Sequence, residues 1–406
     1  MSKRLLILGG GREAYQGIKY LKAEYGLELV VCDSDVCAPG FELADHCLVG
    51  SVYHLENCLP EILKFHNKYP LDGVMCIACD ATNIVARIAQ ILGLPGLPIE
   101  VADRTVNKLG MKDKLSEDNL PIPAYTKVNS PFDLKEKAHR WKLVVVKPID
   151  SRGSKGVSIF SHDQDPNWAF DYAMSHSKGK QVMLERFLPG PQISTESVVI
   201  DGKVVTPAIS DRCYDFFDKY SPFIVENGGD MPSFLRPQLK NKIEVLLESS
   251  IRSLGLNNCI VKGDIVVHEG IPHIIELAGR LSGGYFCTHQ IPFSTGINLV
   301  GAAAMLCLGE KLNPSDWEPK HSKPVSSRWL LSDKQGYVKS FEDPLILQKS
   351  AGTLAFETWI EQGQKIELTT FPAVSVAMVQ ATGSDRLQAT LNAKNALNSF
   401  ALKLID

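Results

Sequence analysis

The chain has 406 residues, more than one ordinary core can serve, so two or three domains are expected. Its formal net charge of −3 and its 22% of charged residues predict no general electrostatic attraction to nucleic acid or to a membrane. No apolar run approaches the length of a membrane span, and the short apolar run after Arg4 is interpreted as a buried strand and not as a signal peptide. The ten cysteines, most of them in apolar segments, predict free thiols in a reducing cytoplasm.

The first hundred residues alternate short apolar strands with helical stretches, the βαβ pattern of a parallel, doubly wound sheet. Strands are expected at residues 5–8, 29–32 and 73–77, and helices near 13–25, 54–67 and 82–92. The turn Gly9-Gly10-Gly11-Arg12-Glu13-Ala14 matches G-x-G-x-x-A, and Asp33 ends the second strand. These are elements of the dinucleotide fingerprint. An NAD-dependent dehydrogenase is therefore an alternative that the front of the chain leaves open.

The rest of the chain predicts α+β structure. We expect a helix over 105–119, strands at 143–147, 157–160, 181–185, 194–200 and 203–208, a helix at 237–254 and a hairpin over 260–277. After Pro314 the composition becomes linker-like, and short strands and a last helix near 386–400 follow. The predicted domains are residues 1–104, 105–315 with a lid subdomain at about 120–186, and a small C-terminal α+β domain at 316–406.

A buried strand ending in Lys147 precedes a small basic loop, whose sequence is Ser151-Arg152-Gly153-Ser154-Lys155-Gly156. Backbone N–H groups in such a loop can face phosphates, although the P-loop pattern is absent and no helix follows. A mobile hairpin with exposed basic residues is the alternative. Lys147 needs a partner anion, because an unpaired ammonium costs several kcal/mol to desolvate.

The segment Met183-Leu184-Glu185-Arg186-Phe187-Leu188-Pro189-Gly190 runs from a predicted strand into a turn. Its backbone groups and the Glu185 carboxylate could contact the edge of an adenine. An ordinary ion pair at the strand end is the alternative interpretation of Glu185.

The hairpin near 260–277 predicts two carboxylates opposite each other. If its turn, Glu269-Gly270-Ile271-Pro272, centres on Gly270, then Asp264 faces Glu276 at roughly 5 Å. Like charges in that position are destabilising, so one is protonated or a cation lies between them. A magnesium ion completed by substrate phosphates fits the second case, and a register shifted by one residue is the alternative. Just beyond, Arg280 and the backbone of Ser282, Gly283 and Gly284 could stabilise an oxyanion.

Taken in order, these motifs resemble the ATP-grasp superfamily over nearly the whole chain. The resemblance implies a doubly wound pre-ATP-grasp domain, an ATP-grasp domain and a small C-terminal domain, with ATP and Mg²⁺ or Mn²⁺ bound. Asn107-Lys108…Met111-Lys112 is similar to the opening of the family's ATP-grasp region, so Lys108 and Lys147 would contact phosphate. Residues 151–156 would be the flexible lid, Glu185-Arg186-Phe187-Leu188 the adenine hinge, and Asp264 and Glu276 the metal ligands.

The sequence departs from the family pattern at two places. An acid that binds ribose is usual where Gln192 stands, so Gln192 or Glu196 is expected there. The usual E-x-N is Glu276-Leu277-Ala278, which removes an asparagine ligand for a second metal ion.

The form E-x-A-x-R resembles the L-amino-acid (dipeptide) ligases, in which Arg280 would steady an acyl phosphate or a tetrahedral intermediate. The resemblance extends over 210–227 and makes Arg212, Glu226 and Asn227, with Arg280 and Gly284, candidates for substrate binding.

The resemblance thus predicts an ATP-dependent carboxylate–amine ligase, in which a carboxylate is activated as an acyl phosphate and an amine then displaces phosphate. Arg280, Lys147, Ser282 and Gly283 are the expected catalytic residues. The expected partners are small carboxylates and amines, in a cytoplasmic homodimer. The alternatives are an ATP-grasp carboxylase or purine-pathway ligase, the dehydrogenase, and a nucleotide-binding protein without catalysis.

Overall fold

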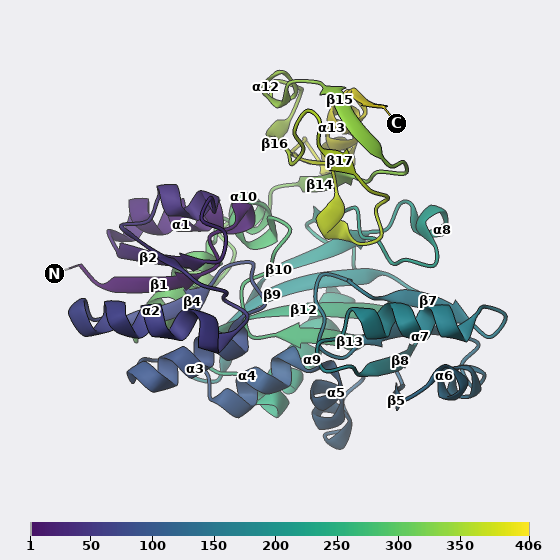
Figure 1. Ribbon diagram of the computed structural model, residues 1–406, viewed down its shortest axis with the longest axis horizontal. Helices are drawn as coiled ribbons and strands as arrows, with labels where there is room; N and C mark the ends of the chain where they lie inside the picture. Colours follow the sequence, from purple (N-terminus) through teal and green to yellow (C-terminus); the bar gives the residue numbers. More distant parts are fainter. Residues whose placement is uncertain (1, 406) are drawn as a thin grey trace.

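The apolar strands at the start of the chain pair in parallel and form an N-terminal domain (Figure 1). In the computed structural model, which describes residues 2–405, the strand order is β3-β2-β1-β4. The strands are β1 (Arg4–Leu8), β2 (Glu28–Asp33), β3 (His46–Val49) and β4 (Gly73–Cys76). The helices are α1 (Arg12–Tyr25), α2 (Leu55–Lys68) and α3 (Thr82–Leu92). Strand β3 was not predicted, because it is short and half exposed and lacks an apolar run.

The helix predicted over 105–119 is wrong, because the chain forms two helices there. Helix α4 (Ile99–Val106) ends at Asn107, and α5 (Lys108–Glu117) begins directly after it. Asn107 is extended, and its side chain accepts a hydrogen bond from the Gly110 N–H at 3.0 Å, which caps α5. The domain boundary predicted at 104 therefore falls inside α4.

An antiparallel sheet in the order β5-β8-β6-β7 forms the smaller half of the nucleotide-binding region. Its strands are β5 (Tyr125–Val128), β6 (Leu143–Pro148), β7 (Ser158–Ser161) and β8 (Val182–Arg186). Helices α6 (Pro131–Ala138) and α7 (Pro166–Ser175) pack on it through a small apolar core. The loop between β6 and β7, which we call the lid loop (residues 151–156), is the basic loop described above.

The largest sheet has eight strands in the order β13-β12-β9-β10-β11-β14-β18-β16. Its first part consists of β9 (Gln192–Ile200), β10 (Lys203–Cys213), β11 (Gly228–Met231), β12 (Cys259–His268) and β13 (Ile271–Ala278). Helix α8 (Phe217–Tyr220) lies beside this part, and α9 (Pro237–Leu254) packs on one face of it. Strands β14 (Val325–Leu330), β16 (Thr353–Thr358) and β18 (Ala377–Ala381) continue the same sheet. The sheet therefore runs across the boundary predicted at 315.

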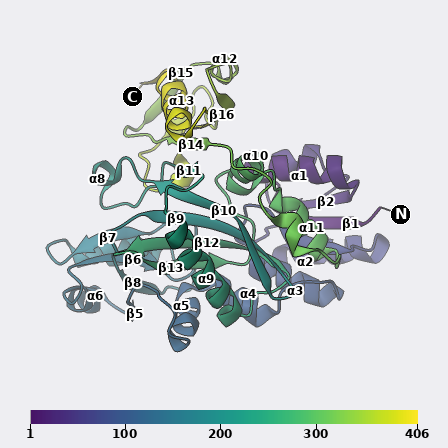
Figure 2. The same cartoon turned by 180° about the vertical axis from the view of Figure 1, so that it is seen from behind.

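The C-terminal part rises above the large sheet as a separate lobe (Figures 1 and 2). It adds a three-stranded sheet in the order β17-β15-β19. Its further elements are β15 (Gly336–Phe341), α12 (Pro344–Leu347), β17 (Lys365–Ile366), α13 (Arg386–Asn398) and β19 (Leu402–Ile405).

The β12–β13 hairpin has the predicted pairing of Asp264 with Glu276, but not the predicted turn. His268 pairs with Ile271, so the turn is the two residues Glu269 and Gly270, both with positive φ (50° and 75°), as in type I′ turns. The register shifts by one residue between Asp264 and Ile265, which is a β-bulge in β13. The extra residue of the bulge offsets the shorter turn, so Asp264 still pairs with Glu276.

A shared apolar core fixes the N-terminal domain against the large sheet. Leu5 and Ile7 of β1 belong to the same buried cluster as Val198 of β9 and Ile260 of β12. Helices α10 (Ile291–Thr295) and α11 (Leu299–Cys307) contribute to this cluster between the two sheets. Within residues 2–405, no single helix has the length and hydropathy to cross a bilayer. One bent pair of helices, Phe286–Thr295 with Leu299–Cys307, has the length and composition of a span, and it includes these core helices.

Candidate active site

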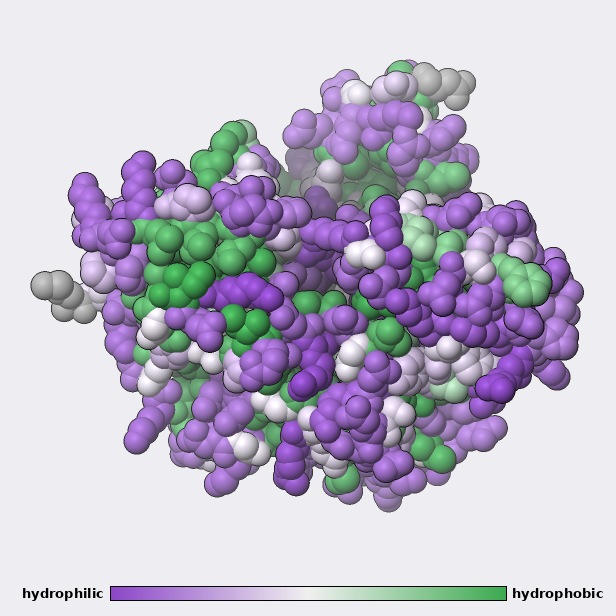
Figure 3. All heavy atoms as spheres, turned by 60° about the horizontal axis from the view of Figure 1, so that its bottom comes forward, coloured by the Kyte–Doolittle hydropathy of each residue, from purple (hydrophilic) through white to green (hydrophobic). Residues whose placement is uncertain are grey.

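A cavity of about 770 Å³ lies where the N-terminal domain, the lid loop, the large sheet and the C-terminal lobe meet. Figure 3 shows a mostly hydrophilic face with a recess below the C-terminal lobe. The cavity brings together most of the predicted site residues: Lys108, Lys147, Ser151, Arg152, Gly153, Ser154, Lys155, Glu185, Arg186, Phe187, Leu188, Gln192, Arg212, Glu226, Asp264, Glu276, Arg280, Ser282, Gly283 and Gly284. Three predicted residues do not line it: Gly156, Glu196 and Asn227.

Glu185, near the end of β8, is almost fully buried at the nucleotide end of the cavity. Its Oε2 lies 2.5 Å from Nζ of Lys112 and 2.9 Å from Nζ of Lys147. Burial alone would raise the pKa of Glu185, but the two ammonium groups outweigh burial and hold the pKa below its ordinary value. Burial also lowers the pKa of Lys112 to about 8.

Two expectations change as a result. The anion expected for Lys147 is supplied by the protein itself, so its burial is no argument for a bound phosphate. Glu185 makes an ion pair at the strand end, which was the alternative interpretation, and its partner Lys112 had no predicted role.

The lid loop is held over the cavity by contacts from three sides. Lys108 Nζ donates a hydrogen bond to the Ser151 carbonyl at 2.6 Å. The Arg152 guanidinium donates to the Asp80 carbonyl at 3.1 Å and lies 3.5 Å from the Tyr53 ring centroid. From the C-terminal lobe, Phe371 lies beneath Lys155 Nζ at 5.1 Å. The loop is thus closed against both neighbouring domains.

Gly156 shapes the lid loop and does not line the cavity. Its φ is +77°, and an added Cβ would lie 2.7 Å from Pro148 and from His176. The prediction of a direct nucleotide contact there is replaced by this structural role.

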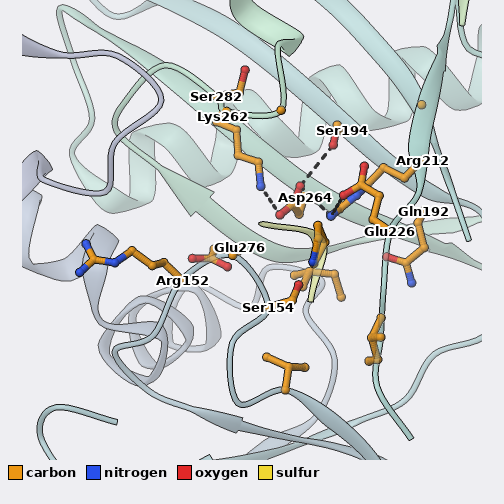
Figure 4. Close-up of a pocket in the computed structure, with 18 of the residues that line it drawn as sticks. Arg152, Ser154, Gln192, Ser194, Arg212, Glu226, Lys262, Asp264, Glu276 and Ser282 are labelled. Atoms are coloured by element: carbon orange, nitrogen blue, oxygen red, sulfur yellow. Dashed lines mark hydrogen bonds and ion pairs between the residues drawn. The ribbon is translucent and has the colours of Figure 1, made fainter. Parts of the chain in front are cut away.

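The predicted metal ligands face each other across β12 and β13, and both line the cavity. Arg212, Lys262 and Ser194 converge on Asp264, as Figure 4 shows. Burial would raise the pKa of Asp264, but the Arg212 guanidinium and the Lys262 ammonium lower it to about 2. Glu276 lies 3.2 Å from Lys108 Nζ. The protein's own cations therefore keep the two carboxylates from repelling each other, and keep Asp264 ionised.

The two candidates for the ribose position have different surroundings. Gln192 lines the cavity near the hinge. Glu196 is completely buried and accepts hydrogen bonds from the N–H of Ser282 at 3.0 Å and from its hydroxyl. Burial raises the pKa of Glu196 to about 7. The prediction of Glu196 as a nucleotide contact is therefore corrected: it anchors the turn at Ser282.

Arg280 stands at the opposite end of the cavity, which we call the acyl end. Its Nε donates to Asp80 Oδ1 at 2.5 Å, and its Nη1 donates to the Leu281 carbonyl at 2.8 Å. Burial would lower the pKa of Arg280, but the Asp80 carboxylate outweighs burial and raises it. Asp80 follows β4 in the N-terminal domain, at the carboxyl edge of a parallel sheet where ligand sites are common.

The backbone donors predicted for an oxyanion are mostly engaged within the protein. The N–H of Ser282 donates to Glu196, and the N–H of Gly284 donates to Glu13 Oε2 at 2.8 Å. This corrects the predicted oxyanion role of these two backbone groups and of the Ser282 hydroxyl. Arg280 remains as a charged donor at the acyl end.

The predicted substrate residues separate into two groups. Arg212 and Glu226 form an ion pair in the cavity wall. Asn227 is buried, and its side chain accepts a hydrogen bond from the Asp215 N–H at 2.9 Å, so it supports the neighbouring loop. This corrects its predicted contact with substrate.

Sequence reasoning missed the cavity residues contributed by the flanking domains. These are Arg12, Glu13, Tyr53, Ala78 and Asp80 from the N-terminal domain and Ser327, Trp329, Trp359 and Pro372 from the C-terminal lobe. Their only signal was that an acid, Asp80, follows β4 and that Glu13 follows three glycines.

The glycine-rich turn has a structural explanation. The Asp33 carboxylate accepts a hydrogen bond from the Gly10 N–H at 2.7 Å, and a Cβ on Gly10 would lie 2.9 Å from Val31. The acid expected at a ribose is therefore used within the domain, which removes the basis of the dehydrogenase alternative.

Residues 105–284 match the ATP-grasp domain, and residues 23–96 match the ATP-grasp N-terminal domain. Among curated proteins, the chain is similar to the formate-dependent phosphoribosylglycinamide formyltransferase of Prochlorococcus marinus, with 30% identity over 194 residues, 46% of this chain and 48% of that protein. The chain thus spans about half the length of the first curated relatives it matches.

The chain resembles solved structures over its whole length. The L-amino acid ligase from Bacillus licheniformis has a TM-score of 0.84 at 18% identity, over 100% of this chain and 99% of that one. The phosphoribosylglycinamide synthetase from Anaerococcus prevotii has a TM-score of 0.75 at 21% identity, over 100% of both chains. At these identities the likeness establishes the fold.

Lys108, the basic lid loop and the Asp264–Glu276 pair surround one cavity. Both domain matches occur in the order that the fold requires. The two matches together span more than half of the chain, which therefore belongs to the ATP-grasp family. The predicted superfamily and the predicted α/β and α+β fold class are confirmed.

Proposed function

We propose that this protein activates a substrate carboxylate with ATP as an acyl phosphate and couples it to an amine, releasing ADP and phosphate. The observation that carries the proposal is that Lys108, the lid loop, the Asp264–Glu276 pair and Arg280 line one cavity. A phosphate-binding end and a cationic acyl end within one enclosure suit a reaction that moves a phosphoryl group onto a carboxylate.

At the nucleotide end, the hinge residues Glu185–Leu188 and Gln192 would hold adenine and ribose. Lys108 and the lid loop would hold the phosphates, because they present an ammonium and backbone N–H groups to the cavity. Lys147 forms an ion pair with Glu185 at this end.

Asp264 and Glu276 are suited to a divalent cation such as Mg²⁺ or Mn²⁺, since both are carboxylates and Asp264 stays ionised far below neutral pH. Within residues 2–405, no group of three or more His, Cys, Asp or Glu could hold a metal ion alone, so ATP oxygens would complete the ligand set. Such an ion, when bound, would neutralise charge on the phosphates. Ala278 supplies no oxygen for a second ion, in place of the family's asparagine.

At the acyl end, Arg280 would bind the substrate carboxylate and then the oxyanion that forms when the amine attacks. A guanidinium fixed by Asp80 is preorganised for this charge, which makes it effective in a site closed to water. The closed lid loop would protect the acyl phosphate from hydrolysis.

The wall beyond Arg280 favours amino acids as substrates. The Arg212–Glu226 ion pair places one polar group of each sign in the wall, and Tyr214, Phe217, Trp329 and Trp359 offer apolar surface. A zwitterion with an apolar side chain matches this combination.

The test is a panel of amino acid pairs scored for phosphate release with ATP and Mg²⁺, with products identified by mass spectrometry. We expect ADP and phosphate only when an acid and an amine are both present, together with a product of their summed mass less water. ATP binding without turnover on any pair would instead indicate a nucleotide-binding protein without catalysis.

A second candidate is a purine-pathway type of ligase, favoured by the 30% identity to the Prochlorococcus formyltransferase over 194 residues. Adding glycine or formate with phosphoribosyl amines to the panel separates the two candidates. A homodimer and a cytoplasmic location stay predictions.

A further inference from the structure

Glu13 has an unexpected position for a residue of a glycine-rich turn. It lies in the first turn of α1, yet its side chain lines the cavity at the acyl end. Its Oε2 accepts the hydrogen bond from the Gly284 N–H at 2.8 Å. Within residues 2–405 this is the one hydrogen bond to its carboxylate, which leaves Oε1 available to a ligand.

The opposite wall is shaped to admit this carboxylate. An added Cβ on Gly283 would lie 2.6 Å from Glu13 Oε2. Any side chain at 283 would therefore displace Glu13. Gly283 is required for this close approach, and the Gly284 N–H fixes the carboxylate once it is there.

Glu13 faces charged and titratable groups from three elements. The groups that interact electrostatically with its carboxylate are Arg12 of α1, Asp80 after β4, and Arg280, Tyr285 and Cys287 after β13. Burial raises the pKa of Glu13, and the Gly284 N–H with the two arginines only partly offsets this. A carboxylate of this kind is a better proton acceptor than an exposed one.

We propose that Glu13 is the general base that removes a proton from the ammonium of the amine substrate at the acyl end, next to Arg280. The inference rests on the proposed ligase function. The other acids that line the cavity are each paired with a cation, including Glu185 with Lys147 and Glu276 with Lys108. Asp80 is neutralised by Arg280, Glu226 by Arg212, and Asp264 by Arg212 and Lys262.

The step balances as follows. Glu13 takes one proton from R–NH₃⁺ and becomes a neutral acid, leaving R–NH₂ with a free electron pair. That pair forms the C–N bond to the acyl carbon, and the C–O bond to phosphate breaks with its electron pair going to phosphate. The second proton lost from nitrogen leaves with phosphate, and Glu13 returns its proton to solvent.

The test compares two nucleophiles on the variant Glu13→Gln. The glutamine can still accept the Gly284 N–H through its amide oxygen, but it cannot act as a base. Hydroxylamine is largely unprotonated at neutral pH and needs no base, so it traps the acyl phosphate directly as a hydroxamate. The natural reaction uses the amino acid pair with the highest phosphate release in the panel.

We expect Glu13→Gln to lower kcat for the amino acid amine by about 100-fold or more. Hydroxamate formation should stay within about twofold of the wild-type rate, because activation precedes the proposed step. In the wild type, kcat with the amine should fall as the pH drops through the raised pKa of Glu13, and this dependence should be absent in the variant. Glu24→Gln, an exposed acid on the same helix, is the matched control and should change neither rate.

An equal loss of both rates in Glu13→Gln would show that Glu13 only shapes the site, and unchanged amine coupling would show that it is no base. A wild-type protein that forms neither product nor hydroxamate would contradict the ligase function itself. The two failures are thus distinguishable.

Discussion

At the nucleotide end of the cavity, the charge of Glu185 is balanced by Lys112 and Lys147 of the same domain, whereas at the acyl end the charge of Arg280 is balanced by Asp80 of another domain. The first cluster lies within the matched ATP-grasp domain. The second forms only when the N-terminal domain is seated against the hairpin that carries Arg280, 200 positions away in the chain from Asp80.

The difference predicts where mutations will act. Substitutions in the Lys112–Glu185–Lys147 cluster should reduce stability, because they leave a buried charge without its partner. Substitutions at the acyl end should mainly reduce turnover, because Arg280, Asp80 and Glu13 line the cavity.

The largest expected effect is that of Arg280→Ala. Removing the donor to the developing oxyanion should lower kcat/KM by about 10²–10³-fold, measured by phosphate release with saturating ATP. Arg87→Ala is the matched control, since Arg87 makes a similar ion pair with Asp103 but does not line the cavity. If the two variants lost activity equally, the distinction between the two ends of the cavity would not hold.

Lys112→Met should lower the free energy of unfolding by about 3 kcal/mol, because Glu185 then stays buried with one cation in place of two. Chemical denaturation of the two single variants and of the double variant Lys112→Met/Glu185→Gln measures the coupling free energy between Lys112 and Glu185. The double variant should recover part of the loss. Additive losses would mean that the buried ion pair contributes nothing specific.

Asp80→Asn should lower kcat roughly tenfold with little change in KM for ATP, because Arg280 loses its fixed orientation. The lid contact should survive, since Arg152 binds the main-chain carbonyl of Asp80 and not its side chain. Steady-state kinetics with varied ATP tests this. A rise in KM for ATP without a fall in kcat would place Asp80 at the nucleotide end.

The smallest expected effect concerns Glu196, whose pKa rises from 4.5 to about 7 on burial. Between these values the folded protein holds a proton that the unfolded chain releases, so Glu196 makes stability fall as the pH rises. When the pH is raised from 5 to 7.5, the Tm of Glu196→Gln should therefore increase by about 2 °C relative to the Tm of the wild type. If the difference in Tm between the variant and the wild type were the same at both pH values, the Glu196 carboxyl would not titrate in this range.

The nucleotide end was largely predictable, because its parts are short local patterns. The valine-rich strand before Lys147 and the basic loop after it are adjacent in the chain, and so are the two strands of the Asp264–Glu276 hairpin. Even the hairpin register was right despite a wrong turn, because a bulge in β13 offset the shorter loop.

The acyl end was not predictable from sequence patterns. Glu13 and Gly284 are 271 positions apart, and nothing in either segment indicates that they meet. Glu196 and Asn227 were assigned to ligands because polar residues beside a motif attract functional interpretations, but both satisfy buried backbone groups. Such long-range contacts depend on how domains pack, which local periodicity does not encode.

The central claim is that the substrate carboxylate is phosphorylated before the amine attacks. Turnover of a substrate carrying ¹⁸O in its carboxylate, followed by mass spectrometry of the released phosphate, tests it directly. An acyl phosphate transfers one carboxylate oxygen to phosphate when its C–O bond breaks, so each phosphate should contain one ¹⁸O. Release of unlabelled phosphate during product formation would contradict the mechanism.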